Sequence, residues 1–266
     1  MTALRFTPLT LTNGLTFKNR LVVPPMASQT ADLNGLATDA TLNHYHNLAQ
    51  SGAGLVMVEY SHVNLAGRSE SNQLGAHDDA CLPGLSQIAA TLHKAGVKTG
   101  LQITHCGGKD SAGISTDIMG PSGITVPAYD RVLPTPRAMT LDDINQWQQD
   151  FVNAAIRADK AGFDLVELHC AHGYGINQWL SPLTNQRQDK YGGSLKNRAR
   201  ILLEMVSKIK QAAPRLAVMT RIPGQDGYPG GLSHDDMGQM SQWLVDAGVE
   251  ILNVSSGIGG WNRPKD

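Results

Sequence analysis

The sequence contains only three cysteines among its 266 residues, Cys81, Cys106 and Cys170. They stand too far apart to suggest a disulfide framework, and they lack the close spacing of metal-binding cysteines. A fold held by disulfides or built around a cysteine-ligated metal is therefore disfavoured. We expect a reducing, cytoplasmic setting.

Long apolar runs and net charge are also lacking. The longest strictly apolar runs, such as Leu55 to Val58, have four residues, far fewer than a membrane span needs. The first residues, MTALRFTPLTL, lack the apolar core of a signal peptide. A formal net charge of −1 gives no reason to expect nucleic acid or a membrane surface as a partner. We expect a small-molecule substrate, and homo-oligomer formation is left open.

An ordinary globular composition is present instead. Hydrophobic residues make up 41% of the chain and charged residues 17%, which is enough to bury a core. The length suits one large α/β domain as well as two small ones. Since no obvious break divides the chain, we expect residues 1–266 to form a single domain.

Predicted strands and helices alternate along the chain. Short apolar segments bounded by Gly, Pro or polar residues predict strands, and longer amphipathic segments predict helices. An Asn13-Gly14 turn between apolar residues predicts an N-terminal β-hairpin lid over residues 9–17. The predicted strands are 20–26, 54–60, 97–104, 163–168, 216–222 and 249–255. The predicted helices are 41–50, 82–95, 140–161, 194–213 and 233–247.

This alternation predicts an α/β fold with a parallel sheet. No G-x-G-x-x-G follows the first strand, which disfavours a dinucleotide-binding doubly wound sheet. A (β/α)8 TIM barrel fits better, although the chain offers six strands where closure needs eight. Two further units would take about 60 to 80 residues. We therefore expect a barrel truncated after its sixth strand, with strands 7 and 8 beyond residue 266.

The stretch 162–198 is the centre of the predicted site. Its apolar strand ends at His169, and His172 and Tyr174 follow. Chemistry in α/β proteins collects where parallel strands end at their carboxyl tips. A single histidine there would more often be a structural residue bonded to the backbone. Two imidazoles and a phenol together favour a functional site that donates hydrogen bonds to a ligand.

These strand-end segments resemble the Old Yellow Enzyme family of FMN-dependent ene-reductases, the NADH:flavin oxidoreductases. The resemblance spans nearly the whole chain. Its most specific part is HCAHGYGINQWLSPLTNQRQDKYGGSLKNR, close to the family's H-x-A-H-G-Y and N-x-R-x-D-x-Y-G-G-S-x-x-N-R patterns. The supporting segments are FKNRLVVPPM, VEYSHVNLAGR, LQITHCGGK, GPSGI, TPRAMT and VSSG.

The resemblance implies a TIM barrel with FMN lying over the carboxyl ends of its strands. Pro25, Met26 and Ala27 match first-strand residues that lie along the flavin. Tyr60 matches a second-strand position where the family usually has a small residue. Gln102 matches the glutamine that pairs with the pyrimidine edge, for which an amide is suited because it both donates and accepts hydrogen bonds.

The resemblance also implies a reaction. Arg221 matches the arginine beside flavin N1 and O2, where a fixed cation stabilises the reduced flavin. His169 and His172 match the pair that binds the electron-withdrawing oxygen of the substrate and so polarises its conjugated C=C bond. Hydride from flavin N5 would reach the β-carbon, and Tyr174 matches the tyrosine that protonates the α-carbon. The electrons would come from NADH or NADPH.

Three departures from the family pattern stand out. Ala27 occupies a position where Cys or Thr usually contacts the flavin, and Gly108 occupies one where arginine is common. The strands that hold the FMN phosphate through backbone N–H groups and an arginine are absent from residues 1–266. We therefore hypothesise that these residues alone bind FMN weakly or not at all.

Two other functions stay open. A different TIM-barrel enzyme, such as an aldolase or a metal-dependent hydrolase, needs a lysine at a strand tip or carboxylates near the histidines. No predicted strand ends in lysine, but Glu167 lies two residues before His169 and faces the same side of its strand. A truncated, non-catalytic family member would instead bind a partner through its open sheet edge.

Overall fold

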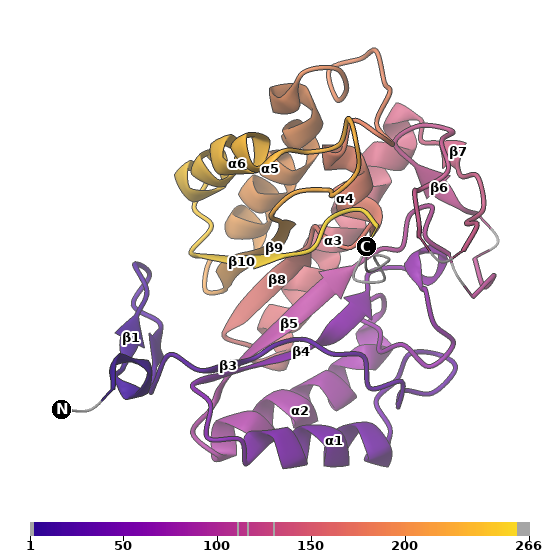
Figure 1. Ribbon diagram of the computed structural model, residues 1–266. Coiled ribbons are helices and arrows are strands. Elements are labelled where there is room, and N and C mark those ends of the chain that lie inside the picture. Colours follow the sequence, from indigo (N-terminus) through magenta and orange to yellow (C-terminus); the bar gives the residue numbers. More distant parts are fainter. Residues whose placement is uncertain (1–2, 111, 116, 130, 260–266) are drawn as a thin grey trace.

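A six-stranded parallel sheet forms the centre of the computed structural model, which describes residues 3–110, 112–115, 117–129 and 131–259. The strand order is β10-β9-β8-β5-β4-β3. Figure 1 shows the sheet as a half-barrel with helices along its outside. The strands are β3 (Val22–Val23), β4 (Leu55–His62), β5 (Lys98–Thr104), β8 (Leu165–His169), β9 (Ala217–Pro223) and β10 (Ile251–Ser255). All six predicted strands are thus observed, the first of them much shortened.

The five predicted helices are observed within a few residues of their expected ends. The helix after 140 begins at a capping box: the Thr140 hydroxyl accepts the Asp143 N–H at 3.1 Å, and the Asp143 carboxylate accepts the Thr140 N–H at 2.8 Å. It ends at Gly162, whose φ of 92° is readily adopted only by glycine. The helices are α1 (Asp39–Ala49), α2 (Leu82–Lys94), α3 (Leu141–Ala161), α5 (Leu195–Ala212) and α6 (His234–Asp246).

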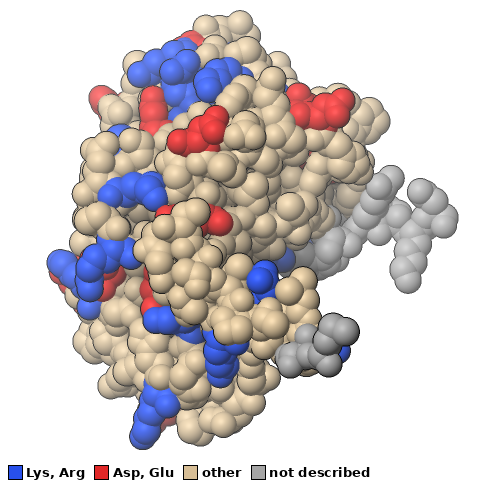
Figure 2. All heavy atoms as spheres, turned by 90° about the vertical axis from the view of Figure 1, so that its left-hand side faces the viewer, with Lys and Arg blue, Asp and Glu red and all other residues tan. Residues whose placement is uncertain are grey.

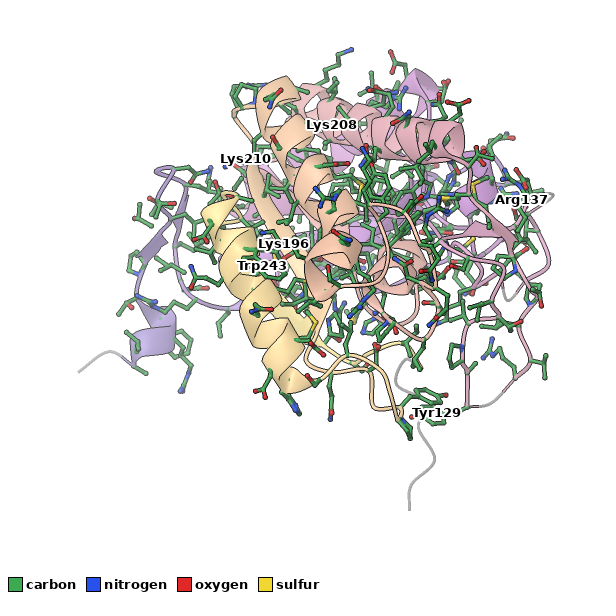
Figure 3. All side chains as sticks on the ribbon, turned by 90° about the horizontal axis from the view of Figure 1, so that it is seen from above. Tyr129, Arg137, Lys196, Lys208, Lys210 and Trp243 are labelled. Atoms are coloured by element: carbon green, nitrogen blue, oxygen red, sulfur yellow. The ribbon has the colours of Figure 1, made fainter. Side chains whose placement is uncertain are left out.

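The main core lies between the sheet and these helices. Val56, Leu101 and Val166 point outward from three neighbouring strands, and each is fully buried. Burial of each such side chain stabilises the fold by about 1.5–3 kcal/mol. Lys196 and Trp243 join α5 to α6 at the surface, where the Lys196 ammonium lies 4.3 Å from the centre of the indole ring (Figure 3).

A smaller cluster fills the inside of the half-barrel near the amino ends of the strands. Leu55, Met57 and Leu165 belong to it. Gly100 faces them, and a Cβ atom there would lie 2.5 Å from the Met57 sulfur, so that a larger residue would force the Met57 side chain to move. The amino end of the half-barrel is therefore filled by apolar side chains, whereas the carboxyl end carries the polar groups.

The N-terminal hairpin lies at this amino end. Strands β1 (Leu9–Thr10) and β2 (Thr16–Phe17) pair antiparallel, and Phe17 packs with the inner cluster together with Leu9 and Leu15. The hairpin therefore contacts the end of the half-barrel opposite to the predicted site. A role as a lid remains a prediction.

The half-barrel has two open edges. Among the described residues, no strand pairs with the outer side of β3 or of β10. Val22 on the first edge is 48% exposed and Val254 on the second is 65% exposed. The sheet is thus a parallel arc of six strands, and its closure by two further strands remains a prediction.

Several short elements were not predicted. Helix α4 (Gly175–Leu180) is buried at every residue, but six residues are too few to show helical periodicity. Two short parallel strands, β6 (Met119–Gly120) and β7 (Arg137–Ala138), lie within the segment predicted as a loop. Three 3-10 turns complete the structure, η1 (Leu4–Phe6), η2 (Leu65–Gly67) and η3 (Asp79–Cys81).

Charged residues of the N-x-R-x-D-x-Y-G-G-S-x-x-N-R motif hold the backbone after α4. Arg187 and Asp189 form an ion pair of 2.6 Å, and Arg187 Nη1 also donates to the carbonyls of Pro121 and Met139. Arg198 Nε donates to the Leu180 carbonyl at 2.7 Å. These bonds hold the turn that leads from α4 to α5.

The surface carries charges of both signs. On the face shown in Figure 2, acidic and basic side chains are interspersed with uncharged residues. Within the described part of the chain, no helix combines the length and the apolar character needed to cross a bilayer.

Candidate active site

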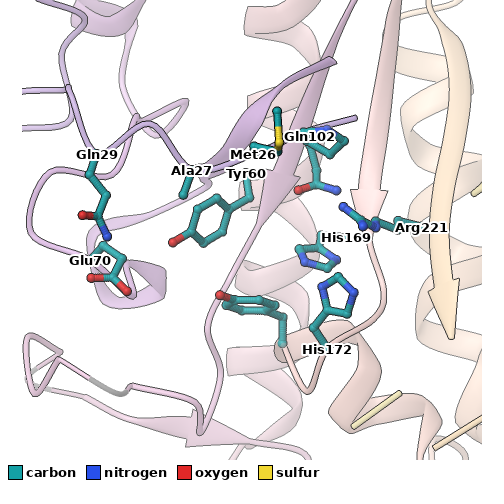
Figure 4. Close-up of a pocket in the computed structure, with 11 residues that line it drawn as sticks. Met26, Ala27, Gln29, Tyr60, Glu70, Gln102, His169, His172 and Arg221 are labelled. Carbon is teal, nitrogen blue, oxygen red and sulfur yellow. The ribbon is translucent and has the colours of Figure 1, made fainter. Parts of the chain in front are cut away.

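A cavity of about 410 Å³ opens at the carboxyl ends of the strands. Its size is within the usual range for small-molecule sites. Figure 4 shows side chains converging on it from β4, β5, β8 and β9. All nine predicted site residues line it: Pro25, Met26, Ala27, Tyr60, Gln102, His169, His172, Tyr174 and Arg221. Sequence reasoning missed two further lining residues, Gln29 and Glu70, because they lie on loops that carry no periodic signal.

A β-bulge turns Tyr60 into this pocket. The pairing of β4 with β5 shifts register between Val58 and Ser61, so that the side chains after Val58 change sides. The Glu59 N–H donates to the Tyr45 hydroxyl at 2.9 Å, and the Glu59 carboxylate accepts a hydrogen bond from α1 through the same hydroxyl. Glu59 is thereby held toward α1, and Tyr60 takes the pocket-facing position.

Three rings after the tip of β8 form the centre of the site. The His169 ring lies 5.0 Å from the His172 ring and 4.7 Å from the Tyr174 ring, centre to centre. His172 has a φ of 61°, a left-handed conformation that costs a histidine about 1–3 kcal/mol. Lys109 supports the turn, since its ammonium donates to the His172 carbonyl at 2.5 Å and lies 4.8 Å from the Tyr174 ring centre.

Both histidines are neutral near pH 7. Burial, assisted by the Arg221 and Lys109 charges, lowers the pKa of His172 to about 3. Burial and the neighbouring His172 lower the pKa of His169 well below its usual value. A neutral imidazole carries one N–H donor, and its other nitrogen is an acceptor.

Neighbouring groups indicate which nitrogen carries each proton. His169 Nδ1 accepts the Ala171 N–H at 3.4 Å, which leaves the proton on Nε2. Arg221 Nη2 donates to Ser255 Oγ at 3.3 Å, so the Ser255 hydroxyl can donate to His172 Nε2, 2.6 Å away. That arrangement leaves the proton of His172 on Nδ1.

Tyr174 is a protonated phenol at neutral pH. Burial raises its pKa to about 12, although interactions with the Ser69 and Tyr60 side chains oppose the rise. Its ring lies 5.6 Å from that of Tyr60. The site therefore contains a weak acid beside two neutral hydrogen-bond donors.

A layer of polar groups lies just below the histidines. Gln102 Nε2 donates to Glu167 Oε2 at 2.7 Å, and Asn253 Nδ2 donates to Glu167 Oε1 at 2.8 Å. Arg221 Nε is buried without a hydrogen-bond partner among the described residues. Both oxygens of Glu167 are thus engaged by amides, and the described residues hold no group of three His, Cys, Asp or Glu side chains placed to bind a metal.

Comparison with known proteins identifies the family. The model of the NADH:flavin oxidoreductase / NADH oxidase family matches residues 5–259, which is most of the chain. The chain belongs to this family. The resemblance predicted from its motifs is confirmed. FMN is the cofactor of these oxidoreductases, and NAD(P)H is their electron donor.

Curated relatives are NADPH dehydrogenases. The chain is 40% identical over 253 residues to an NADPH dehydrogenase of Bacillus pumilus, covering 95% of this chain and 73% of the relative. It is 38% identical over 244 residues to one of Listeria welshimeri, covering 91% and 70%.

Solved structures of this family share the half-barrel. An Old Yellow Enzyme homologue from Zymomonas mobilis has a TM-score of 0.86 at 25% identity, covering 99% of this chain and 78% of that one. Morphinone reductase in complex with tetrahydroNAD has a TM-score of 0.83 at 26% identity, covering 96% and 74%. 2-Naphthoyl-CoA reductase has a TM-score of 0.90 at 25% identity, but this chain spans only 41% of it.

The pocket residues fit a flavin ring. Among the described residues the buried Arg221 Nε–H has no hydrogen-bond partner, and together with the fixed positive charge of the side chain it suits the electron-rich pyrimidine end of the ring. Gln102 lines the same side of the pocket. Ala27 offers only a methyl group to the pocket.

Proposed function

We propose that this site reduces the activated C=C bond of enones or related electron-poor alkenes, using electrons from NAD(P)H. The observation that supports it is the convergence of His169, His172 and Tyr174 on the pocket that Gln102 and Arg221 line. Two neutral donors and one weak acid on the same wall match what a polarised alkene requires. FMN, when bound, supplies the hydride.

The two histidines bind and polarise the substrate. His169 Nε2–H and His172 Nδ1–H donate to the carbonyl or nitro oxygen of the substrate, which gains negative charge as the C=C bond is reduced. Their low pKa keeps them neutral, and a neutral donor does not surrender its proton to that oxygen. Their role is therefore to stabilise developing charge and to fix the orientation of the alkene.

Tyr174 supplies the proton to the α-carbon. With a pKa of about 12 it holds its proton on Oη at neutral pH and releases it only to a strongly basic carbon. Its ring centre lies 4.7 Å from that of His169, a separation that would let the acid and the oxygen-binding donor reach adjacent parts of one substrate. Arg221 stabilises negative charge at the cofactor end of the pocket.

Separate half-reactions of the FMN-loaded protein test this function. Tyr174→Phe should leave flavin reduction by NADPH or NADH nearly unchanged and slow reoxidation by 2-cyclohexenone by about 100-fold or more, the usual contribution of a general acid. Tyr129→Phe is a matched control, because the Tyr129 hydroxyl donates to the Gly227 carbonyl outside the pocket. Equal losses of rate in both half-reactions of Tyr174→Phe would exclude Tyr174 as the proton donor. If no electron-poor alkene reoxidises the flavin, the proposed reaction is wrong.

A further inference from the structure

Glu167 is a fully buried carboxylate that the proposed reaction does not use. It lies on β8, two residues before His169, and faces the inside of the half-barrel. Its two oxygens accept hydrogen bonds from Gln102 on β5 and Asn253 on β10. One side chain thus joins three strands in the layer below the pocket.

This arrangement determines which end of the Gln102 amide faces the pocket. A carboxylate only accepts hydrogen bonds, so the NH₂ group of Gln102 has to face Glu167. Gln102 Oε1 then faces the pocket, and among the described residues it accepts no hydrogen bond. Turning the amide over would bring its carbonyl oxygen to the carboxylate, and the lost charged hydrogen bond disfavours that state roughly ten- to 100-fold.

Asn253 reinforces the same arrangement from the other side. Its Nδ2 donates to Oε1 at 2.8 Å, so this oxygen stays an acceptor and carries no proton. Burial raises the pKa of Glu167 to about 7, although the two amides and the Arg221 charge oppose the rise. The carboxylate form therefore dominates above that pH.

We propose that Glu167 is a positioning residue that fixes the polarity of the Gln102 amide, so that the pocket presents a hydrogen-bond acceptor and selects ring ligands with an N–H at that edge. The inference rests on the proposed function only in taking the ring to be a flavin, whose pyrimidine edge carries the N3–H group. Glu167 contacts neither cofactor nor substrate and acts through Gln102.

The ratio of the affinities for two flavins tests the proposal at about pH 8.5, where Glu167 is ionised. FMN carries the N3–H group, and N3-methyl-FMN lacks it. The wild-type protein should bind FMN at least about tenfold more tightly than N3-methyl-FMN, measured by quenching of flavin fluorescence. In Glu167→Gln the amide oxygen at 167 accepts from Asn253 and its NH₂ group faces Gln102, so the Gln102 oxygen is drawn away from the pocket and the ratio of the two affinities should fall to one or below.

A paired variant separates positioning from structural support. In the double variant Glu167→Gln/Gln102→Glu, the amide at 167 donates to the carboxylate at 102 and still accepts from Asn253. The free carboxylate oxygen again faces the pocket, so the preference for FMN should return. A purely structural role predicts that Glu167→Gln weakens both flavins equally and leaves the ratio unchanged, which would overturn the proposal.

A flavin-free measurement keeps this test distinct from that of the proposed function. The side-chain amide protons of Gln102 should exchange slowly in the wild-type NMR spectrum, with one shifted downfield by the carboxylate, and this signature should vanish in Glu167→Gln. Rapidly exchanging, unshifted Gln102 amide protons in the wild type would overturn the proposal. Slow exchange of the Gln102 amide protons in a protein that binds neither flavin would contradict the proposed function and leave the positioning role of Glu167 intact.

Discussion

Acidification should destabilise this protein strongly because several buried histidines are held neutral. His62, His105 and His172 are each no more than 3% exposed. Burial lowers the pKa of each to about 3 in the folded chain. In the unfolded chain the pKa is about 6.5. His105 shows the local reason, since its Nδ1 accepts the Gly107 N–H at 2.9 Å and cannot bind a proton without losing that bond.

The direction of the change in the free energy of unfolding depends on whether the folded or the unfolded chain binds protons more readily. Because the folded pKa is lower than the unfolded one, the unfolded chain binds protons first as the pH falls below about 6.5. Between pH 7 and 5, each of the three histidines then removes about 2 kcal/mol from the free energy of unfolding, or about 6 kcal/mol together.

Glu167 acts in the opposite direction. Its folded pKa of about 7 is higher than the 4.5 of an ordinary glutamate. Its contribution to stability is therefore full below about pH 4.5 and is lost as the pH rises through 7. Acidification from pH 7 to 5 recovers about 2 kcal/mol from this residue, so that the net loss from these four groups is about 4 kcal/mol. That loss is comparable to the whole stability of many domains.

Urea unfolding at a series of pH values measures this loss, with tryptophan fluorescence as the signal from the buried Trp147 and Trp179. His105→Asn keeps a side-chain acceptor for the Gly107 N–H but cannot be protonated. The variant should therefore lose about 2 kcal/mol less than the wild type between pH 7 and 5. A free energy of unfolding that is constant within about 1 kcal/mol over this range would refute the reasoning, as would an unchanged slope in the variant.

Two further substitutions test other parts of the structure. His169→Ala removes the Nε2–H donor and should weaken binding of phenol-type ligands to the FMN-loaded protein by about tenfold or more, read from the flavin absorbance; unchanged affinity would exclude a donor role. Gly192→Ala should destabilise the fold by more than about 3 kcal/mol in urea unfolding, because a Cβ there would overlap the Arg187 carbonyl. Gly238→Ala in α6 is its control, with no atom within 4 Å of the added Cβ, and should be neutral or stabilising by up to about 1 kcal/mol. Similar effects of the two glycine substitutions would contradict the packing described.

The pocket was predictable where its residues lie on strand ends. His169 directly follows an apolar run, and Gln102 and Arg221 lie near the carboxyl ends of predicted strands. Parallel strands bring their carboxyl ends to one edge whatever their order. The helix boundaries were predictable for a similar local reason, as the Thr140 cap shows. In both cases the signal lies within a few residues of sequence.

Features that depend on strand neighbours or on irregular backbone were not predictable. Tyr60 faces the pocket because of a bulge in β4, and simple alternation does not indicate such a bulge. Gln29 and Glu70 reach the pocket from loops. The interaction of Glu167 with amides from β5 and β10 depends on the strand order, which is a tertiary property.

A fluorescence titration with FMN shows whether these side chains bind a flavin ring. We expect saturable but weak binding by residues 1–266, with a dissociation constant above about 1 μM, because the family resemblance predicts that the phosphate-binding strands lie beyond residue 266. Arg221→Gln should weaken it about tenfold further, as expected for the loss of a charged hydrogen bond. Flavin quenching that does not saturate, or an affinity unaffected by Arg221→Gln, would contradict the account.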